Sequence, residues 1–170
     1  MVGDSGWELD TPCEGWSVQD LVHHVVAGNL RSASLASGAR HHEAEAPLHG
    51  DLLGPDPVGA FDRSIAAQAD AFDRPGALEQ ACDSAVGELT GRQLLRFRAV
   101  DLVVHAWDLS RALGTDESLD ARLVEHTWLE IEPMVPVMAS LGVFGDGPSG
   151  TLSNQATVQA RVLDATGRRP

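Results

Sequence analysis

The sequence predicts an all-α fold, a four-helix bundle with one short C-terminal helix, and three observations lead there. Apolar residues recur every three or four positions over four long segments, the period of an amphipathic helix. Residues typical of helix N-caps precede several of these segments, and Gly or Pro follows their ends. The sequence offers no convincing strand alternation and no internal repeat. Amphipathic helices of this kind bury their apolar faces against one another in a bundle.

Composition fits one globular domain over residues 1–170. The 170 residues are 43% hydrophobic and 22% charged, enough to bury a core. A net charge of -13 opposes binding to nucleic acid or to an anionic membrane, because both require basic surfaces. The longest apolar runs are too short for a membrane span, and the polar start does not resemble a signal peptide. We therefore expect a cytoplasmic protein with neither nucleic acid nor membrane as a partner.

The first predicted helix runs from Val18 to about Ser37. Ser17 followed by Asp20 forms a capping box, and the apolar stripe that follows has helical spacing. That stripe consists of Leu21, Val22, Val25, Val26, Leu30 and Ala33. Residues 39–56 then lose the period and are rich in Gly, Pro and charge, which predicts a loop. Three histidines in this loop could bind a metal, but a polar loop is the simpler interpretation.

Two further helices are predicted between residues 56 and 114. Asp56 with Pro57 starts one that ends near Phe72, since Asp is a good N-cap and Pro suits the first helical position. A less regular stretch, 78–89, leads to the longest helix, 92–114, which Gly114 ends.

The last third contains the fourth helix, a loop and the short final helix. The fourth helix begins near Ser118 and breaks around Pro133 and Pro136. Residues 142–154 are rich in Gly and Pro and predict a loop, and a short helix over 155–165 follows.

Three polar residues on the 92–114 helix are the strongest functional signal. Asp101, His105 and Asp108 lie at positions i, i+4 and i+7, so they project from nearly the same face. A carboxylate and an imidazole one turn apart on a half-buried face can form a pair of metal ligands. His24, on or beside the stripe of the first helix, is the best-placed third ligand. Two imidazoles and one carboxylate leave a coordination position open, as in catalytic zinc sites, and also accept nickel, cobalt or iron.

Other residues near these positions have weaker signals. Asp20 or Asp108 could hold the second ring N–H of a ligating histidine, and Trp16 and Trp107 could be packing residues or pocket walls. The competing interpretation is that Asp101 and His105 satisfy each other, or that Asp101 pairs with a neighbouring arginine. Cys13 precedes a helix start, where the helix dipole could lower the pKa of its thiol, but the sequence favours an inert, partly buried thiol.

Two motifs carry a resemblance to a known family. The segments TPCEGWSVQDLVHH and RAVDLVVHAWDLSRALG resemble the N-terminal metal-binding domain of the mycothiol-dependent maleylpyruvate isomerase family, part of the DinB-like superfamily. The ending RVLDATGRRP resembles that of its short, single-domain members. The resemblance implies a DinB-like four-helix bundle and a divalent metal, usually zinc, on His24, Asp101 and His105. It further implies a transferase or isomerase in which the metal activates a low-molecular-weight thiol, mycothiol in actinobacteria, for attack on a small electrophilic substrate.

The chain departs from the family pattern in three respects. Asp101 stands where the motif usually has Glu, so the carboxylate is one methylene shorter. Family members generally have a helix before the TPC segment, whereas about ten residues precede it here. Either the chain starts late, or the helix near Ser118 or a homodimer partner closes the bundle. The isomerase also has a C-terminal domain with a catalytic basic residue, so we do not expect isomerisation of maleylpyruvate here. Two rival interpretations stay open: a non-catalytic metal- or small-molecule-binding bundle, and a metal-free helical interaction protein.

Overall fold

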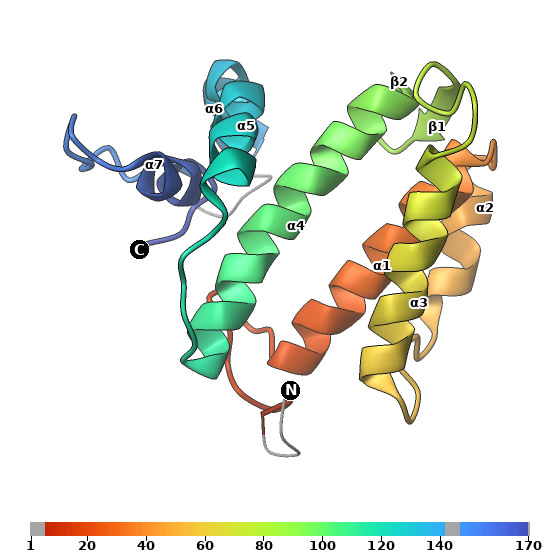
Figure 1. The fold of residues 1–170 in the computed structure, drawn as a ribbon, viewed down its shortest axis with the longest axis horizontal. Coiled ribbons are helices and arrows are strands. Elements are labelled where there is room, and N and C mark those ends of the chain that lie inside the picture. The colour runs from red at the N-terminus through yellow and green to blue at the C-terminus, as the bar shows by residue number, and fades with distance from the viewer. Residues whose placement is uncertain (1–5, 142–146, 170) are drawn as a thin grey trace. The chain divides into compact units, whose positions relative to one another are not determined.

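The computed structural model describes residues 6–141 and 147–169, which are mainly helical with one small two-stranded sheet (Figure 1). The predicted all-α fold class is confirmed. The chain forms two compact units, one comprising Trp16–Ala99 and the other Met1–Gly15 with Val100–Pro170. We call them the α1–α3 unit and the α5–α7 unit after their helices. A single domain over the whole chain, with its helices in one bundle, stays a prediction.

Helix α1, Val18–Ala36, begins where the sequence predicts. The Asp20 backbone N–H donates to Ser17 Oγ over 3.2 Å, and the Asp20 carboxylate accepts from the Ser17 N–H over 2.9 Å. This capping box satisfies N–H groups that the first turn leaves without helical partners. Its predicted apolar stripe is buried or half-buried along the whole helix.

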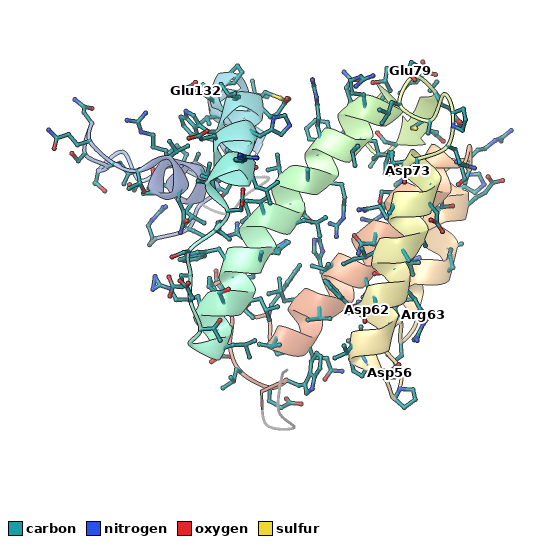
Figure 2. The ribbon with its side chains drawn as sticks, viewed as in Figure 1. Asp56, Asp62, Arg63, Asp73, Glu79 and Glu132 are labelled. Atoms are coloured by element: carbon teal, nitrogen blue, oxygen red, sulfur yellow. The ribbon has the colours of Figure 1, made fainter. Side chains whose placement is uncertain are left out.

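Helix α3, Pro57–Phe72, packs against α1 and has the predicted bounds. The Asp56 side chain accepts from the Gly59 N–H, and it also pairs with Arg63 on the exposed side (Figure 2). Buried hydrogen bonds join the two helices: Asn29 to Ser64 over 2.9 Å and Ser32 to Gln68 over 2.8 Å. These polar pairs satisfy each other inside the core, as buried side-chain groups require.

Two short elements correct the sequence prediction within the α1–α3 unit. Residues 39–56 are not all loop, because they contain α2, His41–Glu45, and the 3-10 helix η1, Ala46–His49. Burial of Ala44 and Leu48 anchors them, but elements of four or five residues are too short to show a period. The expectation of no strand is wrong as well. Strands β1, Ala81–Ser84, and β2, Gly87–Thr90, form an antiparallel hairpin in which few positions are buried, so no alternation is visible.

Helix α4, Gly91–Leu113, is the predicted long helix, and Gly114 ends it with a φ of 62°. Its Arg98 lies buried over Gly28 of α1, where any β-carbon would come within 2.6 Å of Nη1. The guanidinium donates to the Val25 carbonyl and to Asn29 Oδ1. A side chain at position 28 would therefore push the Arg98 guanidinium out of this position.

In the α5–α7 unit, α5 spans Ala121–Ile131 and is capped by Asp120. The predicted start near Ser118 is three residues too early, because the Ser118 N–H donates to the Asp116 side chain in the segment before the helix. The break at Pro133 is confirmed: the 3-10 helix η2, Glu132–Met134, interrupts the chain before α6, Val135–Leu141.

The final helix, α7, spans Val158–Ala165 and starts three residues later than predicted, with Thr157 as its N-cap. Of the predicted loop 142–154, residues 142–146 lie outside the described residues, and 147–154 are loop. Apolar side chains of α4 to α7 form the core of this unit: Val100, Val104, Val124, Ile131, Met138, Val162 and Ala165.

Candidate metal centre

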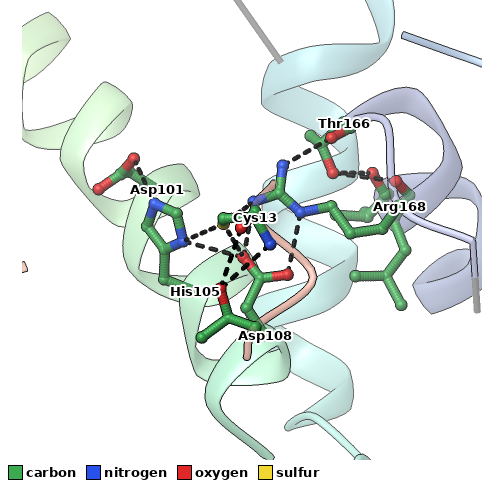
Figure 3. A network of polar contacts seen from close by, with 9 residues as sticks. Cys13, Asp101, His105, Asp108, Thr166 and Arg168 are labelled. Carbon is green, nitrogen blue, oxygen red and sulfur yellow. Dashed lines mark hydrogen bonds and ion pairs between the residues drawn. The ribbon is translucent and has the colours of Figure 1, made fainter. Parts of the chain in front are cut away.

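Polar side chains from three separate parts of the chain meet in the α5–α7 unit (Figure 3). We call them the His105 cluster. Its members are Cys13, Asp101, His105, Asp108 and Arg168. Helix α4 supplies three of them because positions 101, 105 and 108 share one face. Cys13 comes from the segment before α1, and Arg168 follows Gly167 at the end of α7.

His105 is held between two carboxylates at the centre of the cluster. Its Nε2 lies 3.3 Å from Asp101 Oδ1, and its Nδ1 lies 2.9 Å from Asp108 Oδ2. Burial would lower the pKa of His105, but the bonds to Asp101, Asp108 and Cys13 prevail and raise it to about 11. The metal-free protein therefore holds an imidazolium here at neutral pH.

Asp108 is the fully buried hub of the cluster. Its Oδ2 accepts from His105 Nδ1, from Arg168 Nη2 over 2.6 Å and from the Cys13 thiol over 3.4 Å. Its Oδ1 accepts from Arg168 Nε over 3.0 Å, so the guanidinium binds in bidentate fashion. Burial would raise the pKa of Asp108, but the bonds from His105 and Arg168 hold it below its usual range. The site therefore contains an ionised carboxylate away from solvent.

Cys13 lies close to three members of the cluster. Its Sγ is 3.4 Å from Asp108, 3.9 Å from His105 Nδ1 and 3.3 Å from Arg168 Nη2. The other cysteine, Cys82, is buried in the α1–α3 unit, where burial raises the pKa of its thiol. Of the two thiols, Cys13 is the one with charged neighbours.

The other predicted site residues belong to different units. Trp107 lies in the α5–α7 unit, and the α1–α3 unit contains Trp16, Asp20 and His24. Trp107 is buried in the α5–α7 unit, with the Arg111 guanidinium 4.8 Å from its ring centroid. Asp20 is at the surface, where its bonds from the Ser17 side chain and backbone lower its pKa. The ring of His24 lies 4.9 Å from that of Trp16, within the α1–α3 unit. The meeting of His24 with Asp101 and His105, and the pocket roles of both tryptophans, stay predictions.

Comparison with known proteins decides the family. The model of the mycothiol maleylpyruvate isomerase N-terminal domain matches residues 1–110. That stretch is well over half of the chain, and it contains the first motif and all but the last four residues of the second. The chain belongs to this family. Its predicted DinB-like, all-α fold class agrees with the family's helical architecture.

Relatives of this chain are found among curated proteins. Two uncharacterized proteins of Mycobacterium tuberculosis, from strains CDC 1551 / Oshkosh and H37Rv, are each 29% identical to it over 145 residues. Each match covers 85% of this chain and 72% of the relative. No solved structure matches the chain. Family membership points to a metal-binding domain related to mycothiol chemistry, and Asp101 with His105 supplies ligand groups of the kind such a domain needs.

Arg168 is the member of the cluster that sequence reasoning missed. It lies 60 positions from its partner Asp108, and no helical spacing joins residues so far apart. The only sequence signal is the ending RVLDATGRRP, which resembles the family without assigning a role to any of its arginines. Within residues 6–141 and 147–169, no helix combines the length and apolarity needed to cross a bilayer.

Proposed function

We propose that the protein binds one divalent metal through His24, Asp101 and His105 and uses it in thiol chemistry on a small electrophile. One observation supports this most directly: His105 turns Nε2 toward the Asp101 carboxylate while Asp108 holds Nδ1. Metal-ligating histidines characteristically donate their second ring nitrogen to a carboxylate, which fixes the ring. The nitrogen and oxygen donors suit zinc, and also nickel, cobalt or iron.

The metal would supply Lewis acidity that lowers the pKa of a coordinated thiol and so stabilises the thiolate. The residues of the chain have separate tasks in this proposal. Asp108 keeps the His105 ring oriented, and Arg168 keeps Asp108 ionised inside the protein. The thiolate sulfur would bond to the electrophilic carbon of the second substrate while the bond from that carbon to its leaving group, a halide in a haloarene, breaks. The leaving group and the thiol proton would pass to solvent. Mycothiol is the thiol that family membership favours.

Metal content per chain tests the binding step. We expect about one equivalent in the wild type by elemental analysis, and its loss in both His24→Ala and Asp101→Ala. His23→Ala is the matched control, since this neighbouring histidine instead contacts the Gly50 carbonyl over 3.0 Å. Absence of metal from wild-type protein after loading with zinc and washing would contradict the proposal.

The catalytic step needs a separate measurement. The metal-loaded protein, given mycothiol and an electrophile such as a haloarene, should form the thioether adduct faster than metal-free protein. A protein that holds metal in the ligand-dependent way above, but forms no adduct with any electrophile class, is the non-catalytic binder.

A further inference from the structure

A second group of potential ligand atoms lies on the other side of the His105 ring. Cys13 Sγ, His105 Nδ1 and Asp108 Oδ2 all lie within 4.8 Å of one another. Their separations are 3.4 Å from sulfur to oxygen, 3.9 Å from sulfur to nitrogen and 2.9 Å from nitrogen to oxygen. Tetrahedral zinc bonded to sulfur, nitrogen and oxygen separates its ligand atoms by about 3.3–3.8 Å. We call these three residues the thiol set. Their spacing is close to what a metal requires.

Arg168 places a positive charge where that metal would bind. Its Nη2 is 2.6 Å from Asp108 Oδ2 and 3.3 Å from Cys13 Sγ, so it uses lone pairs on two of the three ligand atoms (Figure 3). Its Nε bonds to Asp108 Oδ1, its Nη1 donates to the Thr166 carbonyl over 2.7 Å, and its side chain is 10% exposed. The guanidinium is thus largely buried and fixed by hydrogen bonds to Asp108, Cys13 and Thr166.

Charge balance indicates why the arginine and a metal exclude each other. A divalent metal on the thiol set would meet one thiolate, one carboxylate and a neutral imidazole, a combination with no net charge. With Arg168 present, its guanidinium would keep the lone pairs of Asp108 and Cys13 that the metal needs, and two cations would repel each other at short range inside the protein. Without Arg168, Asp108 would lose its bidentate partner, and a metal could replace it. The His105 Nε2–H could remain bonded to Asp101 in that state.

We propose that Arg168 is a built-in cation that keeps thiophilic divalent metals out of the thiol set, so that neutralising it creates a thiolate metal site. In the native protein, His105 then meets a metal only through Nε2. Metal binding to the thiol set would release the Cys13 thiol proton and the His105 Nδ1 proton to solvent, with no change in oxidation state. The proposal goes beyond the thiol-transfer function and does not depend on His24.

Cobalt(II) titration of the purified full-length protein tests the proposal. Bonding of a thiolate to cobalt gives a sulfur-to-metal charge-transfer band in the near ultraviolet, whereas nitrogen and oxygen ligands give only weak visible bands. We expect no thiolate band in the wild type and, in Arg168→Gln, a thiolate band that saturates at one cobalt per chain, because the neutral His105 ring binds one metal at a time. The double variant Arg168→Gln with Cys13→Ser should lose the band, which also excludes Cys82 as its source.

Two control variants test whether the positive charge at position 168 is responsible, rather than the arginine side chain itself or the loss of any nearby arginine. Arg168→Lys retains the positive charge and should show no band. Arg169→Gln removes the adjacent arginine, which instead pairs with Asp164 over 3.5 Å, and should behave as the wild type. A thiolate band in the wild type, or its absence from folded Arg168→Gln as judged by circular dichroism, would overturn the proposal. If Arg168→Gln does not fold, Arg168→Met takes its place, because its long side chain fills the same space without charge.

These results are distinguishable from failure of the proposed function. Cobalt on His24, Asp101 and His105 would give visible bands without the charge-transfer band, since that set contains no sulfur. Absence of those visible bands from the cobalt-treated wild type would count against the thiol-transfer proposal alone.

Discussion

Competition between a proton and the metal for His105 gives the most quantitative prediction. In the metal-free protein the pKa of His105 is raised to about 11, mainly by Asp101 and Asp108 acting against the effect of burial. A metal that binds Nε2 must first displace that proton. At pH 7 the group is about four units below its pKa, and each unit corresponds to about 1.4 kcal/mol. Protonation therefore weakens the apparent metal affinity by about 5 kcal/mol at neutral pH.

Isothermal titration of zinc into metal-free protein measures this competition. An ordinary histidine is already neutral above about pH 7.5, so its affinity for metal would be nearly flat from there upward. We instead expect the apparent affinity to rise about tenfold per pH unit between about pH 7.5 and pH 8.5. Repeating the titration in buffers of different ionisation enthalpy should show about one proton released per zinc from His105.

The Asp108→Asn variant provides the internal check. It removes one of the two carboxylates that raise the His105 pKa while leaving the proposed ligands in place. We expect the pH dependence to become shallower in this variant. A wild-type affinity that does not change over the same pH range, with no proton released, would refute the reasoning about His105.

Three other predictions concern stability. In metal-free protein, the His105 pKa lies above its unfolded value of 6.5, so its stabilising contribution is complete below about pH 6.5 and is lost as pH rises toward 11. The difference in unfolding free energy between wild type and His105→Gln, from urea denaturation, should therefore fall by about 1.4 kcal/mol per pH unit across that window. Arg168→Ala should cost about 3 kcal/mol because it leaves the buried Asp108 with one charged partner, whereas Arg169→Ala, at a half-exposed side chain, should cost less than about 1 kcal/mol; equal losses would contradict the assignment. Gly28→Ala should lower the thermal midpoint at a cost of about 1–2 kcal/mol, since the new methyl displaces the buried Arg98 guanidinium; an unchanged or raised midpoint would mean that the helix propensity of Ala outweighs the clash.

Helix signals in the sequence were reliable where a long segment carried both period and caps. The predicted bounds of α1 and α3 agree with the structure to within one residue because Ser17 and Asp56 are genuine N-caps. The prediction failed for α2 and the hairpin, whose few buried residues lie against distant parts of the α1–α3 unit. Short elements of this kind depend on tertiary contacts, because a segment of four or five residues is too short to show a hydrophobic period.

The same distinction explains which part of the His105 cluster could be predicted. Helical spacing alone brings Asp101, His105 and Asp108 onto one face, and the structure confirms contacts along that face. Cys13 and Arg168 reach Asp108 from 95 and 60 positions away, so only the folded chain brings them together. Their presence changes the chemistry that the spacing implied. Nδ1 of His105 faces the buried Asp108 carboxylate, which Arg168 already neutralises, whereas Nε2 faces the Asp101 carboxylate. The two ring nitrogens thus meet different environments, and that asymmetry, which Cys13 and Arg168 produce, favours Nε2 for the proposed metal.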